Sequence, residues 1–355
     1  MNIFVTITNL LLKMKIHLKK SFFFVIPAIV GFAEAQAQSV PAKVQPGINT
    51  SFMDKSVKPN NDFFRFVNGT WVENTAIPAD KTTWGSFNEL RQNTDRDALA
   101  ILKEAAANKN LDPNSDQAKA VNVYLTFMDT ISRNKLGIKP IKPFLDKINK
   151  IKNTQDLNQL LLEMESQGGL GFYGIGVGSD AKNSNRNVVN LGLGSLGLPD
   201  RDYYVSDDKD SKEKREKYLT HVARMLVFVG EKPADAKQNA AKVLAIETAM
   251  AKPRLDRVER RDRRKTYNPM TVADLQKLTP TVNWNAYIEG VGIGKIDSLI
   301  VSQPKYMVAL EEIFKTAKID DLKAYMRWTL INKSSGVLTT DIEAASWDFY
   351  SKTLQ

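Results

Sequence analysis

Apolar residues recur at helical spacing over most of this chain, and they change to strand spacing in only one region. From Phe87 onward they fall three and four positions apart, as on the buried face of a helix. Residues 171–177 and 187–193 instead read as two short strands, and the polar segment SDAKNSNR between them reads as a hairpin loop. The pattern therefore predicts a mainly α fold, a multi-helix lobe with a small β-hairpin.

Start and stop signals divide the periodic region into successive helices. Thr154 is expected to cap the fourth helix, Gly168-Gly169 to end it, and Pro233 to stand in the first turn of a later one. We expect helices near residues 87–108, 116–133, 142–151, 154–167, 210–230, 233–251, 271–278, 304–317, 320–332 and 340–355, with a further helical segment led by Trp284.

Composition excludes several kinds of site. The chain has 355 residues, enough for a large core, and no cysteine. It therefore has no disulfide framework, no thiolate nucleophile and no cysteine metal site. The formal net charge of +10 is moderate for this length, so we expect it to aid solubility and do not expect nucleic-acid binding.

The N-terminus has the organisation of a secretory signal peptide, which we assign to residues 1–37. A basic stretch from Met14 to Lys20 precedes the apolar residues 21–33, and Ala35 and Ala37 supply a cleavage box. The apolar run is shorter than the roughly 20 residues that span a membrane. We expect export to the periplasm or the extracellular space and no stable membrane span. Residues 38–60, rich in Pro, Ser, Asn and Lys, are expected to form a linker.

Histidine is too scarce for a histidine-based metal site. The chain contains only His17, inside the signal peptide, and His221, inside a predicted helix. A zinc peptidase usually needs two histidines one helical turn apart with a glutamate, as in H-E-x-x-H. We expect His221 to be a structural residue and assign no metal ligand and no catalytic residue. No G-x-S-x-G motif accompanies His221.

Two further patterns suggest ligand sites but have simpler interpretations. Gly192, Gly194 and Gly197 spell G-x-G-x-x-G, yet turn residues follow where a dinucleotide site needs a helix, so we expect close backbone approach. Residues 254–265 carry seven basic and three acidic side chains. The interleaved acids favour a solvated face or an internal ion-pair network over a polyanion patch.

Three segments carry a resemblance to a known family. The first, within residues 61–91, packs aromatics around Asn68, Gly69 and Pro78, which read as turns of a compact docking segment. The first segment contributes Asp62-Phe63-Phe64, Phe66, Asn68-Gly69, Trp71, Ile77-Pro78, Trp84-Gly85, Phe87 and Leu90-Arg91. The second is Leu196-Gly197-Leu198-Pro199-Asp200-Arg201-Asp202-Tyr203-Tyr204, and the third contributes Arg260, Asp262, Tyr267-Asn268 and Met270-Thr271. Together they resemble the N-terminal half of the neprilysin and endothelin-converting-enzyme family of zinc metallopeptidases, in a bacterial-type member.

The resemblance implies a two-lobed enzyme of which this chain supplies one lobe. In that family a helical lobe covers the site and limits access to short peptides, while a thermolysin-like lobe carries H-E-x-x-H. We assign residues 61–355 to the helical N-terminal domain and expect truncation before the zinc-binding domain. No cofactor is expected in this chain, and zinc is expected in the full-length enzyme. Asn285-Ala286-Tyr287 mimics the family's substrate strand, but its helical setting argues against that role.

One site residue follows from the resemblance. Arg91 matches a family arginine near the substrate, where a guanidinium can meet a peptide carboxylate with two hydrogen bonds. Thr83 and Asn88 stand where neprilysin has an arginine and an aspartate, which departs from its carboxylate-selective subsite.

The functional expectation is the substrate-access domain of an exported metalloendopeptidase that hydrolyses oligopeptides. The missing catalytic lobe is the expected partner, and this chain alone is expected to be inactive. The alternative is a stand-alone helical module that binds peptides without catalysis.

Overall fold

The computed structural model describes residues 47–79, 81–166 and 168–354. The chain divides into two compact units, Met1–Ile77 and Pro78–Gln355, and each is described by itself. The proposed signal peptide and the first part of the expected linker lie outside the described residues.

The first unit is built on the helix α1 (Phe63–Asn74), which begins where the side chain of Asp62 accepts a hydrogen bond from the backbone N–H of Arg65. The short 3₁₀ helix η1 (Thr50–Phe52) packs on it, and the Phe52 and Trp71 ring centroids lie 6.3 Å apart. The segment around residues 50–54 is therefore held against α1.

The expectation of turns at Asn68 and Gly69 is wrong, because both residues lie inside α1. Gly69 sits where α1 meets the preceding segment, and a Cβ added there would lie only 2.6 Å from the Cβ of Asp54. This glycine therefore permits close packing, and the N-cap of Asp62 outweighs its weak helix propensity.

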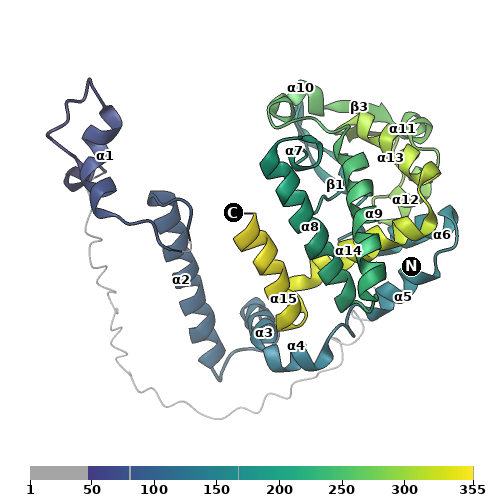
Figure 1. Cartoon of the computed structure of the whole chain (residues 1–355), viewed down its shortest axis with the longest axis horizontal. Helices are drawn as coiled ribbons and strands as arrows, with labels where there is room; N and C mark the ends of the chain where they lie inside the picture. Colours follow the sequence, from purple (N-terminus) through teal and green to yellow (C-terminus); the bar gives the residue numbers. More distant parts are fainter. Residues whose placement is uncertain (1–46, 80, 167, 355) are drawn as a thin grey trace, which may run out of the picture. The chain divides into compact units, whose positions relative to one another are not determined.

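The second unit is mainly helical (Figure 1). Its helices are α2 (Ser86–Ala107), α3 (Asp116–Met128), α4 (Thr130–Leu136), α5 (Lys142–Lys150), α6 (Thr154–Glu165), α7 (Asp202–Val205), α8 (Lys209–Phe228), α9 (Pro233–Ala251), α10 (Arg263–Thr266), α11 (Val272–Leu278), α12 (Trp284–Gly290), α13 (Pro304–Thr316), α14 (Ile319–Ser334) and α15 (Thr340–Trp347), with the shorter turns η2 (Glu259–Arg261) and η3 (Ser335–Val337) and the terminal π-helix η4 (Asp348–Thr353).

Two helix boundaries differ from the expectation. The helix expected over residues 116–133 is two helices, because Asp129 ends α3 and its side chain accepts a hydrogen bond from the Ser132 N–H at the start of α4. The N-cap of α6 is Asn153, one residue before the predicted Thr154. In both places a short Asx side chain satisfies a backbone donor that a helix start leaves open.

The predicted hairpin is confirmed and belongs to a larger sheet. Strand β1 (Tyr173–Asp180) pairs antiparallel with β2 (Asn183–Leu193). Strand β2 pairs in parallel with β4 (Ser298–Val301), which pairs antiparallel with β3 (Asn268–Thr271), so the order is β1-β2-β4-β3.

The expected SDAKNSNR loop is mostly strand, and only two residues separate β1 from β2. Asp180 explains the tight turn, since its carboxylate accepts hydrogen bonds from the Lys182 N–H at 2.9 Å and the Arg186 Nε at 2.8 Å. The hydroxyl of Tyr267, just before β3, donates to the same carboxylate. The turn is therefore fixed by contacts among polar residues that read as a loop in the sequence.

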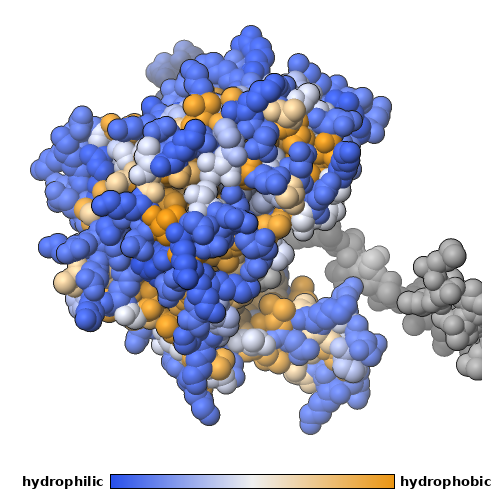
Figure 2. Space-filling view, turned by 90° about the vertical axis from the view of Figure 1, so that its right-hand side faces the viewer, coloured by the Kyte–Doolittle hydropathy of each residue, from blue (hydrophilic) through white to orange (hydrophobic). Residues whose placement is uncertain are grey.

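The core lies among α5, α6, α8, α9, α12, α13 and α14 and one face of the sheet. It is rich in buried aromatic residues, including Tyr218, Trp284, Tyr306, Tyr325 and Trp328. In the described part of the chain no helix is both long and apolar enough to cross a membrane. The surface seen in Figure 2 is mainly hydrophilic, with small hydrophobic patches between the polar residues.

A buried carboxylate joins several parts of this core. Glu247 of α9 is 1% exposed, and its Oε2 accepts hydrogen bonds from the hydroxyls of Tyr204 at 2.7 Å and Tyr218 at 2.6 Å. Its Oε1 accepts from the Trp328 Nε1 at 3.1 Å and the Gly197 N–H at 3.2 Å. Burial raises the pKa of Glu247, and these donors oppose the rise.

We expect Glu247→Ala to destabilise the second unit by about 3 kcal/mol or more, because it leaves buried donors unpaired and opens a cavity. Glu247→Gln keeps the size of the side chain and one acceptor oxygen, so it should lower the free energy of unfolding by less than Glu247→Ala. Glu216→Ala, at an exposed position of α8, is the matched control and should change stability by no more than about 0.5 kcal/mol. Urea unfolding measures all three, and an equal loss for Glu247→Ala and the control would contradict the role of this carboxylate.

Candidate functional site

Arg91 lies on an exposed groove at the start of α2. Its side chain is 82% exposed, and its Nε lies 3.6 Å from the Asp95 carboxylate one helical turn away. The groove has a volume of about 560 Å³. Its lining residues are Lys81, Trp84, Phe87, Asn88, Arg91, Gln92 and Asp95.

The groove combines one guanidinium with two aromatic rings, and Phe87 is 88% exposed. An exposed ion pair such as Arg91–Asp95 contributes little stability, so a ligand carboxylate can replace Asp95 at small cost. The chemistry suits a peptide with a free carboxylate and an apolar side chain. Contact between Arg91 and substrate stays a prediction.

His221 lies inside the core and not at a groove. Its ring on α8 is 5% exposed and stacks on Phe349 of η4, with centroids 4.5 Å apart and an angle of 8° between the planes. Trp328 meets the ring edge to face at 5.5 Å. The Nε2 atom is buried without a hydrogen-bond partner. Burial, helped by the nearby Arg224, lowers the pKa of His221 to about 4.

The described residues of this chain do not fit a zinc site. Among residues 47–79, 81–166 and 168–354, no three His, Cys, Asp or Glu side chains come together in a way that could hold a metal ion. His221 faces aromatic rings, and its environment offers no second imidazole or carboxylate ligand. We therefore derive no catalytic step for the described residues.

Two of the three glycines of the G-x-G-x-x-G pattern permit close packing as expected, whereas a Cβ on Gly192 would only come to 3.6 Å from the Gly174 carbonyl oxygen, an ordinary contact. A Cβ on Gly194 would collide with the carbonyl oxygens of Gly171 and Phe172, and a Cβ on Gly197 would collide with the hydroxyl of Tyr218. No helix begins at this point, since the next one, α7, starts at Asp202. Asn285-Ala286-Tyr287 lies within α12, so its resemblance to a substrate strand does not extend to its structure.

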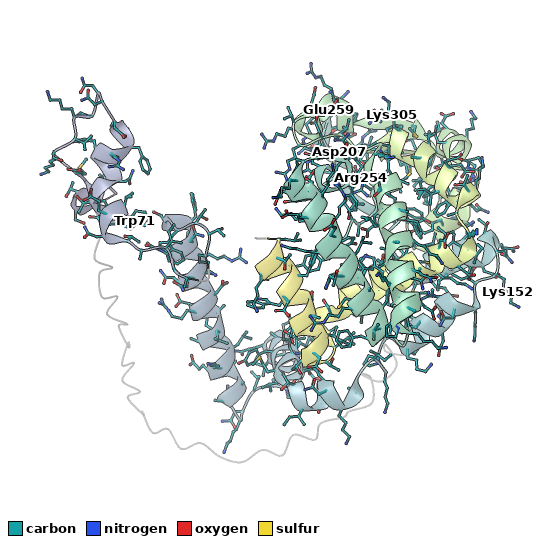
Figure 3. All side chains as sticks on the ribbon, in the orientation of Figure 1. Trp71, Lys152, Asp207, Arg254, Glu259 and Lys305 are labelled. Atoms are coloured by element: carbon teal, nitrogen blue, oxygen red, sulfur yellow. The ribbon has the colours of Figure 1, made fainter. Side chains whose placement is uncertain are left out.

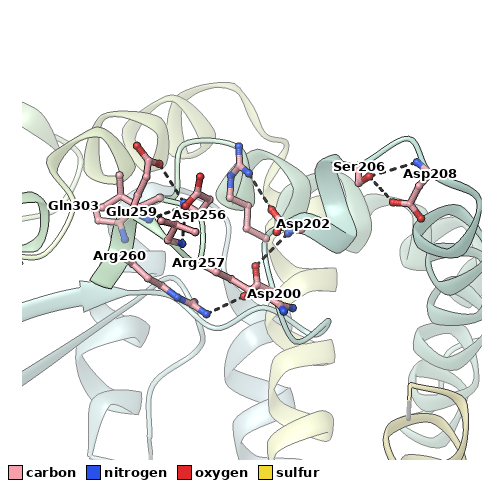
Figure 4. A network of polar contacts seen from close by, with 12 residues as sticks. Asp200, Asp202, Ser206, Asp208, Asp256, Arg257, Glu259, Arg260 and Gln303 are labelled. Carbon is pink, nitrogen blue, oxygen red and sulfur yellow. Dashed lines mark hydrogen bonds and ion pairs between the residues drawn. The ribbon is translucent and has the colours of Figure 1, made fainter. Parts of the chain in front are cut away.

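The basic segment 254–265 forms an ion-pair network, which confirms the internal pairing expected from its interleaved acids. One oxygen of Asp200, whose side chain is 5% exposed, forms ion pairs with Arg257 at 3.2 Å and with Arg260 at 3.0 Å, and the Arg260 contact is also a hydrogen bond (Figure 4). Within the segment, Glu259 pairs with Lys265 and Asp262 with Arg264, each at 2.8 Å.

The network also encloses a cavity that the sequence did not indicate. It lies where the segment Leu196–Tyr204 meets the residues that follow α9, and its walls include the guanidinium-bearing residues Arg201, Arg254 and Arg260. Arg254 lies three residues after the end of α9 (Figure 3). Two sequence features contribute to the site: Asp200-Arg201, a charged pair inside an otherwise apolar and turn-rich motif, and the basic segment 254–265, which supplies Arg254 and Arg260.

Comparison with known proteins identifies relatives over most of the chain. Residues 59–355 match Peptidase family M13, through its N-terminal domain. Endothelin-converting enzyme 1 of Cavia porcellus is 28% identical over 314 residues, which cover 84% of this chain and 40% of that protein. Neprilysin-3 of Drosophila melanogaster is 25% identical over 315 residues, with the same two coverages.

A solved structure agrees with both the fold and the family. The zinc metalloprotease Zmp1 of Mycobacterium tuberculosis, in complex with an inhibitor, superposes with a TM-score of 0.79 at 29% identity, covering 86% of this chain and 47% of that one. These matches confirm the resemblance and the mainly helical fold predicted from the sequence. The chain spans less than half the length of the relatives that it matches.

The buried His221 predicts acid sensitivity of the fold. Its folded pKa of about 4 lies below the value of about 6.5 in an unfolded chain, so below pH 6.5 the unfolded chain binds a proton that the folded chain does not. Stability should therefore fall as the pH drops from 6.5 towards 4. Between pH 7 and pH 5 this histidine should remove about 2 kcal/mol of unfolding free energy.

The matched variant is His221→Phe, which keeps a flat ring against Phe349 and cannot be protonated. Urea unfolding measures the free energy of unfolding at pH 7 and pH 5. Its decrease between the two pH values should be smaller in this variant than in the parent protein, by about 2 kcal/mol. Identical losses in both proteins would contradict the assignment of the acid sensitivity to His221.

Proposed function

The chain belongs to Peptidase family M13, and from this premise we propose that residues 61–355 form the substrate-access domain of a zinc metallopeptidase that hydrolyses oligopeptides. Two observations together support the proposal. Residues 59–355 match the family model, and the described residues do not fit a zinc site. The domain would shape the entrance to a catalytic site that another part of the full-length protein supplies.

The exposed apolar residues of α2, α3 and α4 support a contact with such a part. These helices leave large side chains in water that would normally be buried, and a soluble protein rarely exposes many of them close together. The exposed residues are Phe87, Leu90, Leu99, Ile101, Val123, Leu125, Phe127, Met128, Ile131 and Leu136. We propose that the catalytic lobe covers this face in the full-length enzyme.

We also propose that the protein is exported and processed to a chain that begins after residue 37. The basic, apolar and small-residue regions at the N-terminus support this proposal. The intact mass of the secreted product should correspond to cleavage after Ala37 or Ala35, and a secreted product that retains residues 14–37 would contradict it.

The first test separates this domain from the catalytic chemistry. We expect the purified chain to bind well under one zinc ion per molecule after extensive dialysis, and to show no chelator-sensitive cleavage of oligopeptides. Carboxylates without imidazole or thiolate ligands hold zinc poorly. A protein extended by the downstream coding sequence should gain both properties together.

The opposite results each have a clear meaning. Stoichiometric zinc or chelator-sensitive cleavage by the chain itself would overturn the assignment of chemistry to another part of the protein. A stop codon directly after codon 355, with peptide binding but no cleavage, would instead support the stand-alone peptide-binding module.

The second test concerns Arg91 in the extended enzyme. Arg91→Ala should raise the Michaelis constant for peptides with a free C-terminal carboxylate more than it lowers turnover, as expected for a contact made equally in the ground and transition states. The loss of a charged hydrogen bond predicts a change of about tenfold.

Arg96→Ala is the matched control for this experiment. Arg96 lies on the same helix, is 70% exposed and pairs with Asp97, but does not line the groove. It should leave the Michaelis constant unchanged. Peptides with an amidated C-terminus should not distinguish the Arg91 variant from the parent enzyme, and an unchanged constant for the free acids would remove Arg91 from the site.

A further inference from the structure

The cavity beside Asp200 has the composition of an anion site. Its volume is about 390 Å³, enough for a small molecule. Its lining residues are Leu193, Leu196, Gly197, Leu198, Pro199, Asp200, Arg201, Arg254, Leu255, Arg260, Gln303, Asn332 and Tyr350. Of the three arginines in the lining, Arg260 pairs with Asp200 and Arg201 with Asp202, whereas Arg254 pairs with no carboxylate among the described residues. We propose that this cavity binds a small ligand through a carboxylate or phosphate group.

Arg254 supplies a fixed guanidinium without a carboxylate partner. Its Nε donates to the Met250 carbonyl oxygen at 3.0 Å, and its Nη2 donates to the Gly194 carbonyl oxygen at 2.9 Å. The guanidinium also lies over the ring of Tyr306, 5.1 Å from the centroid. These contacts position the group but leave its charge unneutralised, which is the state that favours a bound anion.

Arg201 supplies a donor that has no acceptor. Its Nη1 donates to Asp202 at 3.1 Å, while its Nε is buried and unpaired. A buried N–H without an acceptor is costly, and an oxygen of a bound anion would satisfy it. The Arg201 side chain lines the cavity and is 28% exposed, so part of it is accessible from solvent.

The polar side chains of Asp200 and Gln303, which also line the cavity, already have partners for their acceptor oxygens. Asp200 forms ion pairs with both Arg257 and Arg260, so its one negative charge is shared by two guanidiniums. Gln303 accepts the Leu255 N–H at 2.9 Å through its Oε1, so the end that remains is an amide nitrogen, which can only donate. The leucines and Pro199 give the ligand an apolar wall.

The cavity is assembled before any ligand arrives. Tyr350 of η4 donates to the Gly197 carbonyl oxygen at 2.9 Å and receives a hydrogen bond from Asn332 at 3.0 Å. The Gly197 N–H is held by Glu247. Such preorganisation reduces the entropy lost on binding. The inference does not depend on the proposed function, because all of the lining residues belong to the described part of this chain.

Calorimetric titration of the purified chain tests the inference with three probes. These are inorganic phosphate, N-acetyl-leucine, which carries a carboxylate, and N-acetyl-leucinamide, which is neutral. We expect at least one of the two anions to bind with one site per chain, the amide not to bind, and added salt to weaken binding. Binding of phosphate alone would indicate a ligand with a phosphate group, and binding of acetyl-leucine alone would indicate a ligand with a carboxylate.

Two variants place the binding in this cavity. Arg201→Gln should weaken anion binding by about tenfold, because it removes a charged donor, and Arg254→Lys should also weaken it because lysine lacks the planar fork. Arg264→Gln is the matched control: Arg264 is 90% exposed, pairs with Asp262 and does not line the cavity.

Thermal unfolding of each variant shows whether it folds, and the parent protein should gain stability in the presence of the anion that binds. Arg254→Lys keeps the test valid if Arg201→Gln does not fold. The absence of binding by both anions, equal binding of the neutral amide, or unchanged affinity in a folded Arg201 or Arg254 variant would overturn the inference.

Discussion

The second unit depends most on the four hydrogen bonds that the buried carboxylate of Glu247 accepts. A buried charge is expensive unless several donors surround it, and here the donors come from α8, α14 and the segment Leu196–Tyr204. Because each donor is directional, the four hydrogen bonds fix the positions of these elements relative to α9 more narrowly than apolar contacts would. The carboxylate therefore contributes specificity of packing as much as stability.

This constraint reaches the candidate site through one segment of chain. Gly197 and Tyr204 both contact Glu247, and Asp200 and Arg201 lie between them. Once the two ends of the segment are held, the loop must present its charged residues to the segment that follows α9. The terminal π-helix η4 joins the same arrangement, since Tyr350 binds the Gly197 carbonyl and Phe349 stacks on His221. Core, cavity and C-terminal helix are thus parts of one hydrogen-bonded and stacked assembly.

The sequence predicted the long helices because their apolar periodicity and caps are local signals. The strands β3 and β4 were not predicted, because four residues each are too few to show a period. Gly69 was predicted to form a turn, but it lies in a helix, where its lack of a side chain allows close contact with Asp54. Glu247 gave no signal either, since a single glutamate in an alanine-rich helix usually faces water. The cavity could not be predicted because Arg201 and Arg254 come together only through tertiary contacts.

Two arginine sites in this chain differ in what holds them in place. Arg91 lies on α2, a helix of 22 residues of which only Ala105 is buried, so its own packing fixes its position weakly. Arg201 and Arg254 lie beside the core, where Arg201 donates one side-chain hydrogen bond to Asp202 and Arg254 donates two, to the carbonyl oxygens of Met250 and Gly194. A binding site needs its groups held in position before the ligand arrives. The cavity meets that condition within this chain, whereas the Arg91 groove needs further contacts to position α2. The exposed apolar residues of α2, α3 and α4 offer a surface for those contacts, and the catalytic lobe that we propose to cover them would also fix the position of the groove.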